Sequence, residues 1–194
     1  MASQLRSARL GQTIVKAGGD CHWSTPTNIY TSNNAYADVI LEGAENWEYS
    51  HWLRATDFGF SIPTGAIING IKVEIEKKSD APYDIHDESV KIVDEGYEAG
   101  TEHKLLGDWT GTDTYYVYGG STDLWGTSWS DSEINAESFG LYISAYNNHG
   151  IVIKDAYIDH ITIKIYYAEG GPSDGPNESM INRLINTNLN NRIN

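Results

Sequence analysis

The chain has 194 residues, a net charge of −14 and one cysteine, Cys21. This length suits one domain with short extensions, and a lone cysteine excludes an internal disulfide and suits folding in a reducing cytoplasm. No apolar run approaches the roughly 18 residues of a transmembrane helix, and the first residues lack the apolar region of a signal peptide, so we expect neither.

The charge is unevenly placed along the chain. Residues 1–16 carry +3, residues 177–194 carry +1, and the residues between them therefore carry −18. An acidic body repels nucleic acid and anionic membranes, so neither is expected as a partner. We expect residues 1–20 to form an extended N-terminal arm, in which Arg6 and Arg9 dock onto a partner.

The first clear strand pattern follows two weaker strand signals at residues 37–41 and 52–58. After a turn at residues 61–65, Ile71, Val73 and Ile75 alternate with charged residues, which is typical of a half-buried strand. The pattern predicts that the strand ends in water at Lys77 and Lys78.

The second half of the chain carries further strand patterns. Residues 139–145 and 156–167 alternate clearly, the latter with a phase change that predicts a β-bulge near Asp159 and His160, and residues 88–93 and 115–118 are weaker strands. Short strands separated by polar turns indicate an all-β fold. We predict an antiparallel β-sandwich of the jelly-roll type over residues 21–168.

Residues 79–135 form a long acidic region that holds three tryptophans. Long segments between strands are often functional. Aromatic rings among hydroxyl and carboxylate side chains are typical of glycan-binding surfaces, and this interpretation places a glycan site at Trp109, Tyr116, Trp125 and Trp129. The alternative is that these rings anchor loops in the core.

Metal and catalytic motifs are weak in this sequence. The six histidines are not spaced as metal ligands. Asp84, Asp87 and Glu88 could hold a calcium ion through their oxygens, although a solvated acidic loop explains them as well. No nucleophile elbow or phosphate-binding loop is found, so we predict no cofactor and no enzyme. A hydrolase using two carboxylates is a third hypothesis, but with 27 acidic residues some pair always meets the required spacing, so such a pair indicates little.

The C-terminal end changes composition abruptly. Residues 169–176 read as a Gly/Pro linker, and seven of the 18 residues in 177–194 are asparagine. Apolar residues in this tail recur at helical spacing, which predicts a short amphipathic helix that docks onto a partner; a disordered tail is the alternative. The predicted docking residues are Met180, Ile181, Leu184, Ile185 and Leu189.

Several motifs resemble a group of β-sandwich proteins of tailed bacteriophages. They are residues 53–63 with 70–75, residues 123–126 with 134–135 and 139–140, and the strand at 156–167. The resemblance covers about residues 23–167 and implies a virion structural protein, such as a head decoration, a head fibre or a tail-associated adhesin. It also implies assembly in the host cytoplasm, other virion proteins as partners and a homo-oligomer such as a trimer.

Two functional hypotheses follow. The first is a non-enzymatic virion structural protein that assembles through its terminal segments. The alternative is a glycan-binding adhesin or carbohydrate-binding module that binds a cell-surface glycan through exposed aromatic rings.

Overall fold

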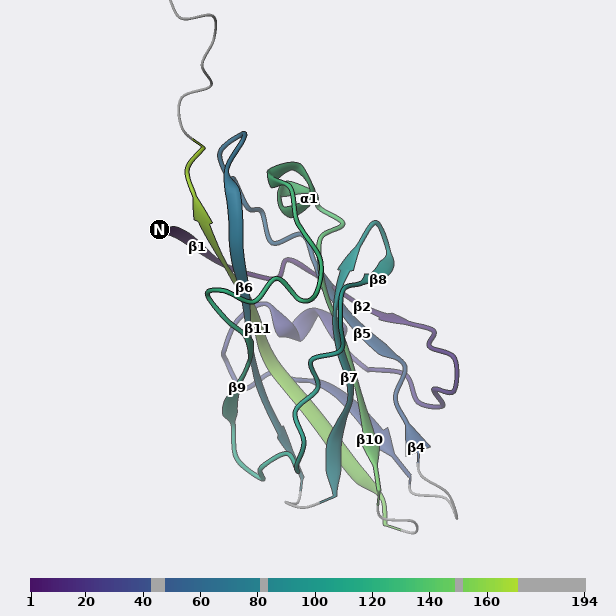
Figure 1. Cartoon of the computed structure of the whole chain (residues 1–194). Helices are drawn as coiled ribbons and strands as arrows, with labels where there is room; N and C mark the ends of the chain where they lie inside the picture. Colours follow the sequence, from purple (N-terminus) through teal and green to yellow (C-terminus); the bar gives the residue numbers. More distant parts are fainter. Residues whose placement is uncertain (43–47, 81–83, 149–151, 171–194) are drawn as a thin grey trace, which may run out of the picture.

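The computed structural model describes residues 1–42, 48–80, 84–148 and 152–170, and these residues fold into two antiparallel sheets packed face to face (Figure 1). Sheet A contains β1 (Ala2–Ser7), β3 (Ala37–Leu41), β6 (Ile67–Ser79), β9 (Thr114–Gly119) and β11 (Lys154–Ala168). Sheet B contains β2 (Leu10–Ile14), β4 (Glu48–Tyr49), β5 (Trp52–Thr56), β7 (Ile85–Asp94), β8 (Tyr97–Ala99) and β10 (Gly140–Asn147). Two short helices join them, η1 (Pro26–Ile29) and α1 (Asp131–Asn135).

The strand order confirms the predicted jelly roll. One sheet runs β3-β11-β6-β9 and the other runs β5-β10-β7-β8, so consecutive stretches of the chain cross repeatedly between the sheets. That interleaved order is the one in which two Greek keys are wound together. The all-β sandwich predicted from the sequence is therefore confirmed.

The alternating strand patterns point into the space between the sheets, as expected. Ile71, Val73 and Ile75 of β6 face Leu141 and Ile143 of β10, and all five are fully buried. The pairing of β11 with β6 shifts register between Ile158 and His160, which confirms the predicted bulge. The pattern of the sequence thus fixes which side of each central strand is core.

The N-terminal segment is part of the sandwich rather than a separate arm. It is extended, as expected, but β1 pairs with residues 162–167 of β11, and β2 pairs along the whole of β5. β11 has 15 residues, and β3 covers only its first five, so β1 pairs with the rest of the same edge. The open backbone groups of that edge are the physical reason for the pairing.

The predicted C-terminal elements cannot be placed on this fold. Most of the predicted linker, and the tail with Met180, Ile181, Leu184, Ile185 and Leu189, lie outside the described residues. Within the described residues, no helix is long and apolar enough to cross a membrane.

Lys77 differs most from the sequence prediction, because it lies in the core instead of in water. Its side chain is fully buried, forms an ion pair with Asp87 of β7, and donates a hydrogen bond of 2.6 Å to the Tyr118 hydroxyl on β9. Tyr118 in turn donates to Asp87 Oδ2 at 2.9 Å. The alternation of β6 therefore continues through Lys77, whose charge is matched across the two sheets.

Asp87 also fixes the long segment between β8 and β9. It accepts hydrogen bonds from the Trp109 indole at 2.9 Å and from the Leu105 backbone at 3.1 Å. The Lys77 ammonium lies 4.2 Å from the Trp109 ring centroid, within cation–π distance. We call Lys77, Asp87, Trp109 and Tyr118 the core ionic cluster. It joins β6, β7, β9 and the segment that precedes β9.

Replacing Asp87 with Asn is expected to destabilise the protein by about 3–5 kcal/mol, because it leaves the Lys77 ammonium buried without a counter-charge. The double variant Lys77→Met/Asp87→Asn removes that charge and keeps an acceptor oxygen, so it should cost less than the single variant. Urea unfolding followed by circular dichroism measures both. A single variant within about 1 kcal/mol of wild type, or a double variant that recovers nothing, would contradict this account.

The stability of the protein should also depend on the ionisation of Lys77. Burial lowers the pKa of Lys77 to about 8, against 10.5 for an exposed lysine. Between pH 8 and pH 10 the unfolded chain therefore keeps a proton that the folded chain releases, so the contribution of Lys77 to the free energy of unfolding should rise with pH. The difference in unfolding free energy between wild type and Lys77→Met measures that contribution.

The neighbouring residue supplies the control. Hydrogen bonds from Lys78 to Tyr36 and Asp113 outweigh burial and raise the pKa of Lys78. The difference in unfolding free energy between wild type and Lys78→Met should therefore stay constant up to pH 10. A difference for Lys77→Met that stays flat or falls across the same window would show that the folded lysine is not destabilised as an ammonium ion.

Candidate binding face

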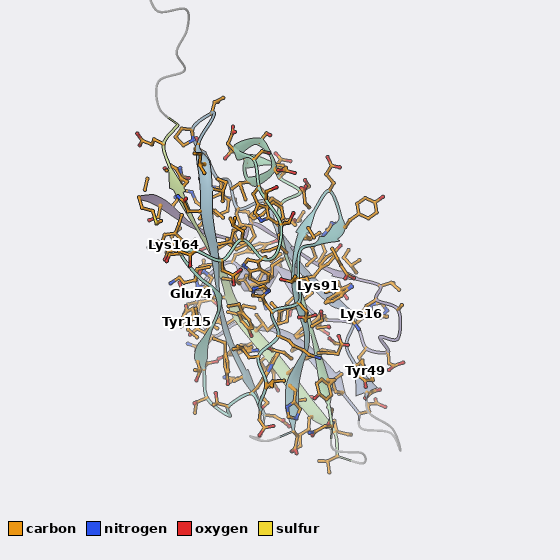
Figure 2. All side chains as sticks on the ribbon, in the orientation of Figure 1. Lys16, Tyr49, Glu74, Lys91, Tyr115 and Lys164 are labelled. Carbon is orange, nitrogen blue, oxygen red and sulfur yellow. The ribbon has the colours of Figure 1, made fainter. Side chains whose placement is uncertain are left out.

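The two outer surfaces of the sandwich differ in chemistry. Figure 2 shows Glu74, Tyr115 and Lys164 on the side of sheet A, and Lys16, Tyr49 and Lys91 on the side of sheet B. The outer surface of sheet A carries charged residues, such as the Lys72–Glu74 ion pair at 3.0 Å, and its ring pairs Tyr36–Tyr157 and Tyr115–His160 meet edge to face. The outer surface of sheet B carries a concentration of rings. We call its members the aromatic face: Tyr49, Trp52, His86, Tyr142 and Tyr146.

Three half-buried rings form a row across this face. Strand pairing places Tyr146 of β10 opposite Tyr49 of β4 on one side and His86 of β7 on the other. The ring centroids of Tyr49 and Tyr146 are 5.8 Å apart with a 27° tilt, and those of His86 and Tyr146 are 4.9 Å apart with a 22° tilt. Burial raises the pKa of Tyr146, which keeps its phenol neutral. The three rings are thus stacked against one another across neighbouring strands at one end of the face.

A second pair of rings supports the middle of the face. Trp52 and Tyr142 stack with centroids 5.2 Å apart and a 15° tilt, and they pack with Ile14 and Val93 in a cluster separate from the main core. Only 5% of Trp52 and 4% of Tyr142 are exposed. This pair therefore forms an apolar floor and offers little ring surface itself.

Charged side chains lie between the two sets of rings. Lys16 forms an ion pair with Glu88 at 2.9 Å, and Ser144 of β10 donates to the same carboxylate at 2.8 Å. The Lys16 ammonium also lies 5.3 Å from the Trp52 ring centroid. Glu88 reaches this surface because β7 has a bulge: Ser89 pairs with Ser144 and Asp87 with Ala145, which leaves Glu88 as the extra residue.

Two hollows open on this side of the sandwich. One, of about 440 Å³, lies beside Trp52 and Lys16, and the other, of about 420 Å³, lies beside Arg54 and Glu95. Tyr142 pairs with Arg54, which lines the second hollow, and with Lys91, which lines the first. Tyr142 therefore lies between the two hollows. The first hollow is lined by charged and apolar groups: Val15, Lys16, Ala17, Trp52, Glu88, Ser89, Lys91, Glu98, Glu102 and Lys104.

The predicted aromatic site at the three loop tryptophans is not formed. Trp109 and Trp125 are at most 1% exposed and Trp129 is 9% exposed. Their indole N–H groups donate to Asp87 at 2.9 Å, to the Ile71 carbonyl at 3.0 Å and to the Leu124 carbonyl at 2.9 Å. These rings pack inside the sandwich, so the alternative reading of the sequence, that they anchor loops, is the one the structure supports.

Tyr116 also fails to form part of an exposed platform. Its ring is half-buried beneath the Lys77 ammonium at 4.4 Å, and its hydroxyl accepts a hydrogen bond from the Thr110 backbone at 2.9 Å. It therefore belongs to the surroundings of the core ionic cluster. None of the four rings chosen from the sequence lies on the aromatic face.

The three candidate calcium ligands point to different partners. Asp84 pairs with Lys154 at 3.1 Å, Asp87 pairs with Lys77, and Glu88 pairs with Lys16. Asp87 and Glu88 also lie on opposite sides of β7, since one is in the core and the other is at the bulge. Among the described residues, no group of three or more His, Cys, Asp or Glu side chains is arranged to hold a metal ion, so these three acids do not come together as one calcium site.

The residues of the aromatic face were missed at the sequence level, although one signal was present. Tyr142, Ser144 and Tyr146 alternate with the core residues of the strand that became β10, so two tyrosines were already assigned to its other side. Tyr49 and His86 become their neighbours only through pairing between strands far apart in the sequence. Strand pairing of this kind cannot be read from a single segment.

Comparisons with known proteins find distant structural similarity only. No family model and no curated protein matches the chain. Among solved structures, a protein described as CBM4 matches with 8% identity and a TM-score of 0.38, covering 82% of this chain and 92% of its own. A family 29 carbohydrate-binding module from Piromyces equi matches with 11% identity and a TM-score of 0.34, covering 90% and 95%. A second family 29 module, described in complex with mannohexaose, matches with 12% identity and a TM-score of 0.37, covering 84% and 93%.

Proposed function

We propose that this chain is a non-catalytic glycan-binding protein that holds an extended saccharide on the aromatic face of sheet B. The observation that carries the proposal is the row of Tyr49, Tyr146 and His86, three half-buried rings stacked on neighbouring strands. A pyranose ring has an apolar C–H surface and a rim of hydroxyls. A stack of aromatic rings that carry polar groups offers both apolar contacts and hydrogen bonds to such a ligand.

The length of the face suits a chain of sugars. Tyr142 and Tyr146 are four residues apart on the same strand, which corresponds to about 13 Å along β10. The hollow beside Lys16 lies next to this stretch, with Trp52 as part of its lining. A ligand that crosses the ring row and enters this hollow therefore contacts both the rings and the charged side chains that line the hollow. We call these side chains the polar wall: Lys16, Glu88, Lys91, Glu98, Glu102 and Lys104.

The polar wall suits uncharged hydroxyl groups. Lysines and glutamates alternate along it, as in the Lys16–Glu88 pair at 2.9 Å and the Lys91–Glu98 pair at 2.5 Å. Such paired groups offer both donors and acceptors, and hydrogen bonds to ionised groups are stronger than neutral ones. Their charges balance locally, so the wall favours a neutral polyhydroxyl ligand over an ion.

The carboxylates of this wall support binding more than acid–base catalysis. Glu102 accepts hydrogen bonds from Ser89 and from the Val90 backbone, and Glu88 is bound by Lys16 and Ser144. Both carboxylates are therefore already hydrogen-bonded within the protein, which suits a fixed binding surface.

Affinity electrophoresis in gels containing soluble polysaccharides, followed by calorimetry on those that retard the protein, tests the proposal. The double variant Tyr49→Ala/Tyr146→Ala removes two rings of the row and should weaken binding about tenfold or more, at up to about 1.5 kcal/mol per ring contact.

Tyr166→Ala provides the matched control, because Tyr166 lies on β11 of the other sheet and is also half-buried. It should bind like wild type, and circular dichroism should show that all variants are folded. If no polysaccharide retards the wild-type protein, or if the double variant and the control bind equally, the aromatic face is not a glycan site.

A virion structural protein stays a prediction that rests on the sequence resemblance. The structure changes how such a protein would assemble, because Arg6 and Arg9 lie in and directly after a strand of the sandwich and are not on a separate arm. The other predicted docking residues lie outside the described residues. Finding this chain by mass spectrometry in purified phage particles supports the prediction, and its absence from them opposes it.

A further inference from the structure

Two arginines meet where the chain crosses from sheet A to sheet B. Arg6 is on β1, and Arg9 lies between β1 and β2. Arg6 Nε donates to the Gly59 carbonyl at 3.3 Å. A Cβ atom on Gly59 would lie 2.2 Å from Arg9 Nη1, and Gly59 has φ of +63°, so glycine is the residue that fits both the backbone and the guanidinium here. Both side chains are therefore held around one residue.

Neither guanidinium has an acidic partner among the residues that the structure describes. In the described part of the chain, the ion pairs of carboxylates are made with lysines or histidines, and neither Arg6 nor Arg9 takes part in one. Arg6 uses its donors on the carbonyls of Leu5 and Gly59. The two guanidinium groups lie beside the same residue, and their mutual repulsion is relieved when an anion binds between them.

A pocket of about 350 Å³ opens beside these arginines, lined by Arg6, Ser7, Ala8, Arg9, Tyr30 and Phe58. Phe58 and Ala8 are almost fully buried and form an apolar base. The Tyr30 hydroxyl accepts a hydrogen bond from the Gly11 backbone at 3.1 Å, while its own proton has no acceptor within the described residues. The pocket thus offers donors from two guanidinium groups and one phenol.

We propose that this pocket binds an oxyanion, the sulfate or phosphate chemistry shared by the free ions and by sulfated or phosphorylated sugars. The planar guanidinium group donates two parallel hydrogen bonds to such oxygens, which a lysine cannot do. The inference rests on the Arg6–Arg9 geometry and is independent of the aromatic face. The acidic body around the pocket disfavours anions elsewhere on the surface, so binding should be confined to this pocket.

Titration of the full chain with inorganic sulfate and inorganic phosphate at constant ionic strength tests the proposal. Two-dimensional NMR follows the Gly59 amide and the arginine Nε–H groups, which should shift together and saturate. Arg9→Gln should weaken binding about tenfold, because one charge-assisted contact is lost. Arg9 is exposed, so this variant is expected to stay folded, which thermal unfolding checks. Arg6→Gln should weaken binding similarly.

Lys164→Gln is the control, because it removes the same charge from the outer surface of sheet A and should leave the affinity unchanged. A sulfated oligosaccharide and its unsulfated parent then distinguish the source of the anion: tighter binding of the sulfated sugar than of free sulfate supports a sugar ligand, and equal binding supports a free ion. The proposal fails if the Gly59 and arginine signals do not saturate, or if Arg9→Gln and Lys164→Gln weaken binding equally.

Discussion

The buried ion pair between Lys77 and Asp87 is the interaction on which the rest of the structure depends. It joins β6 of one sheet to β7 of the other. The Tyr118 hydroxyl and the Trp109 indole donate further hydrogen bonds to the Asp87 carboxylate. A buried charge without these partners is strongly unfavourable, so the four residues must assemble together. Their assembly fixes the spacing of the sheets at one end of the sandwich and holds the segment before β9 in place.

The same cluster determines what lies on the outer surface of sheet B. Asp87 must point inward to reach Lys77, yet Ser89 lies opposite Ser144 two residues further along β7. The bulge at Glu88 reconciles these two positions. It turns the Glu88 carboxylate outward to Lys16 and brings His86 opposite Tyr146. The polar and aromatic parts of the aromatic face are therefore placed by a constraint in the core.

Much of the fold could be predicted from the sequence, because core strands reveal themselves by alternation. β6, β10 and β11 carry clean isoleucine, valine and leucine patterns, and even the bulge before His160 appears as a change of phase. β1 and β2 could not be found this way, since β1 (ASQLRS) has few apolar residues and β2 (LGQTI) is too short to show a clear alternation. Lys77 was misplaced for a related reason: a lysine at a core position is indistinguishable from one that ends a strand until its counter-charge is located.

The candidate site was harder to predict than the fold. The tryptophans in polar segments proved to be core anchors, and the half-buried row of rings consists of residues from β4, β7 and β10 that meet only through strand pairing. Arg6 and Arg9 were singled out by charge alone, whereas their relation to Gly59 and to each other depends on where β1 joins sheet A.

The central claim is that ligand binds on sheet B, and a chemical-shift map recorded during titration with a saccharide fragment tests it most directly. The account predicts that amide signals of Tyr49, His86, Ser144 and Tyr146 move and saturate together, while those of β6, β9 and β11 stay in place. Saturable shifts on the outer surface of sheet A, with sheet B unchanged, would contradict it.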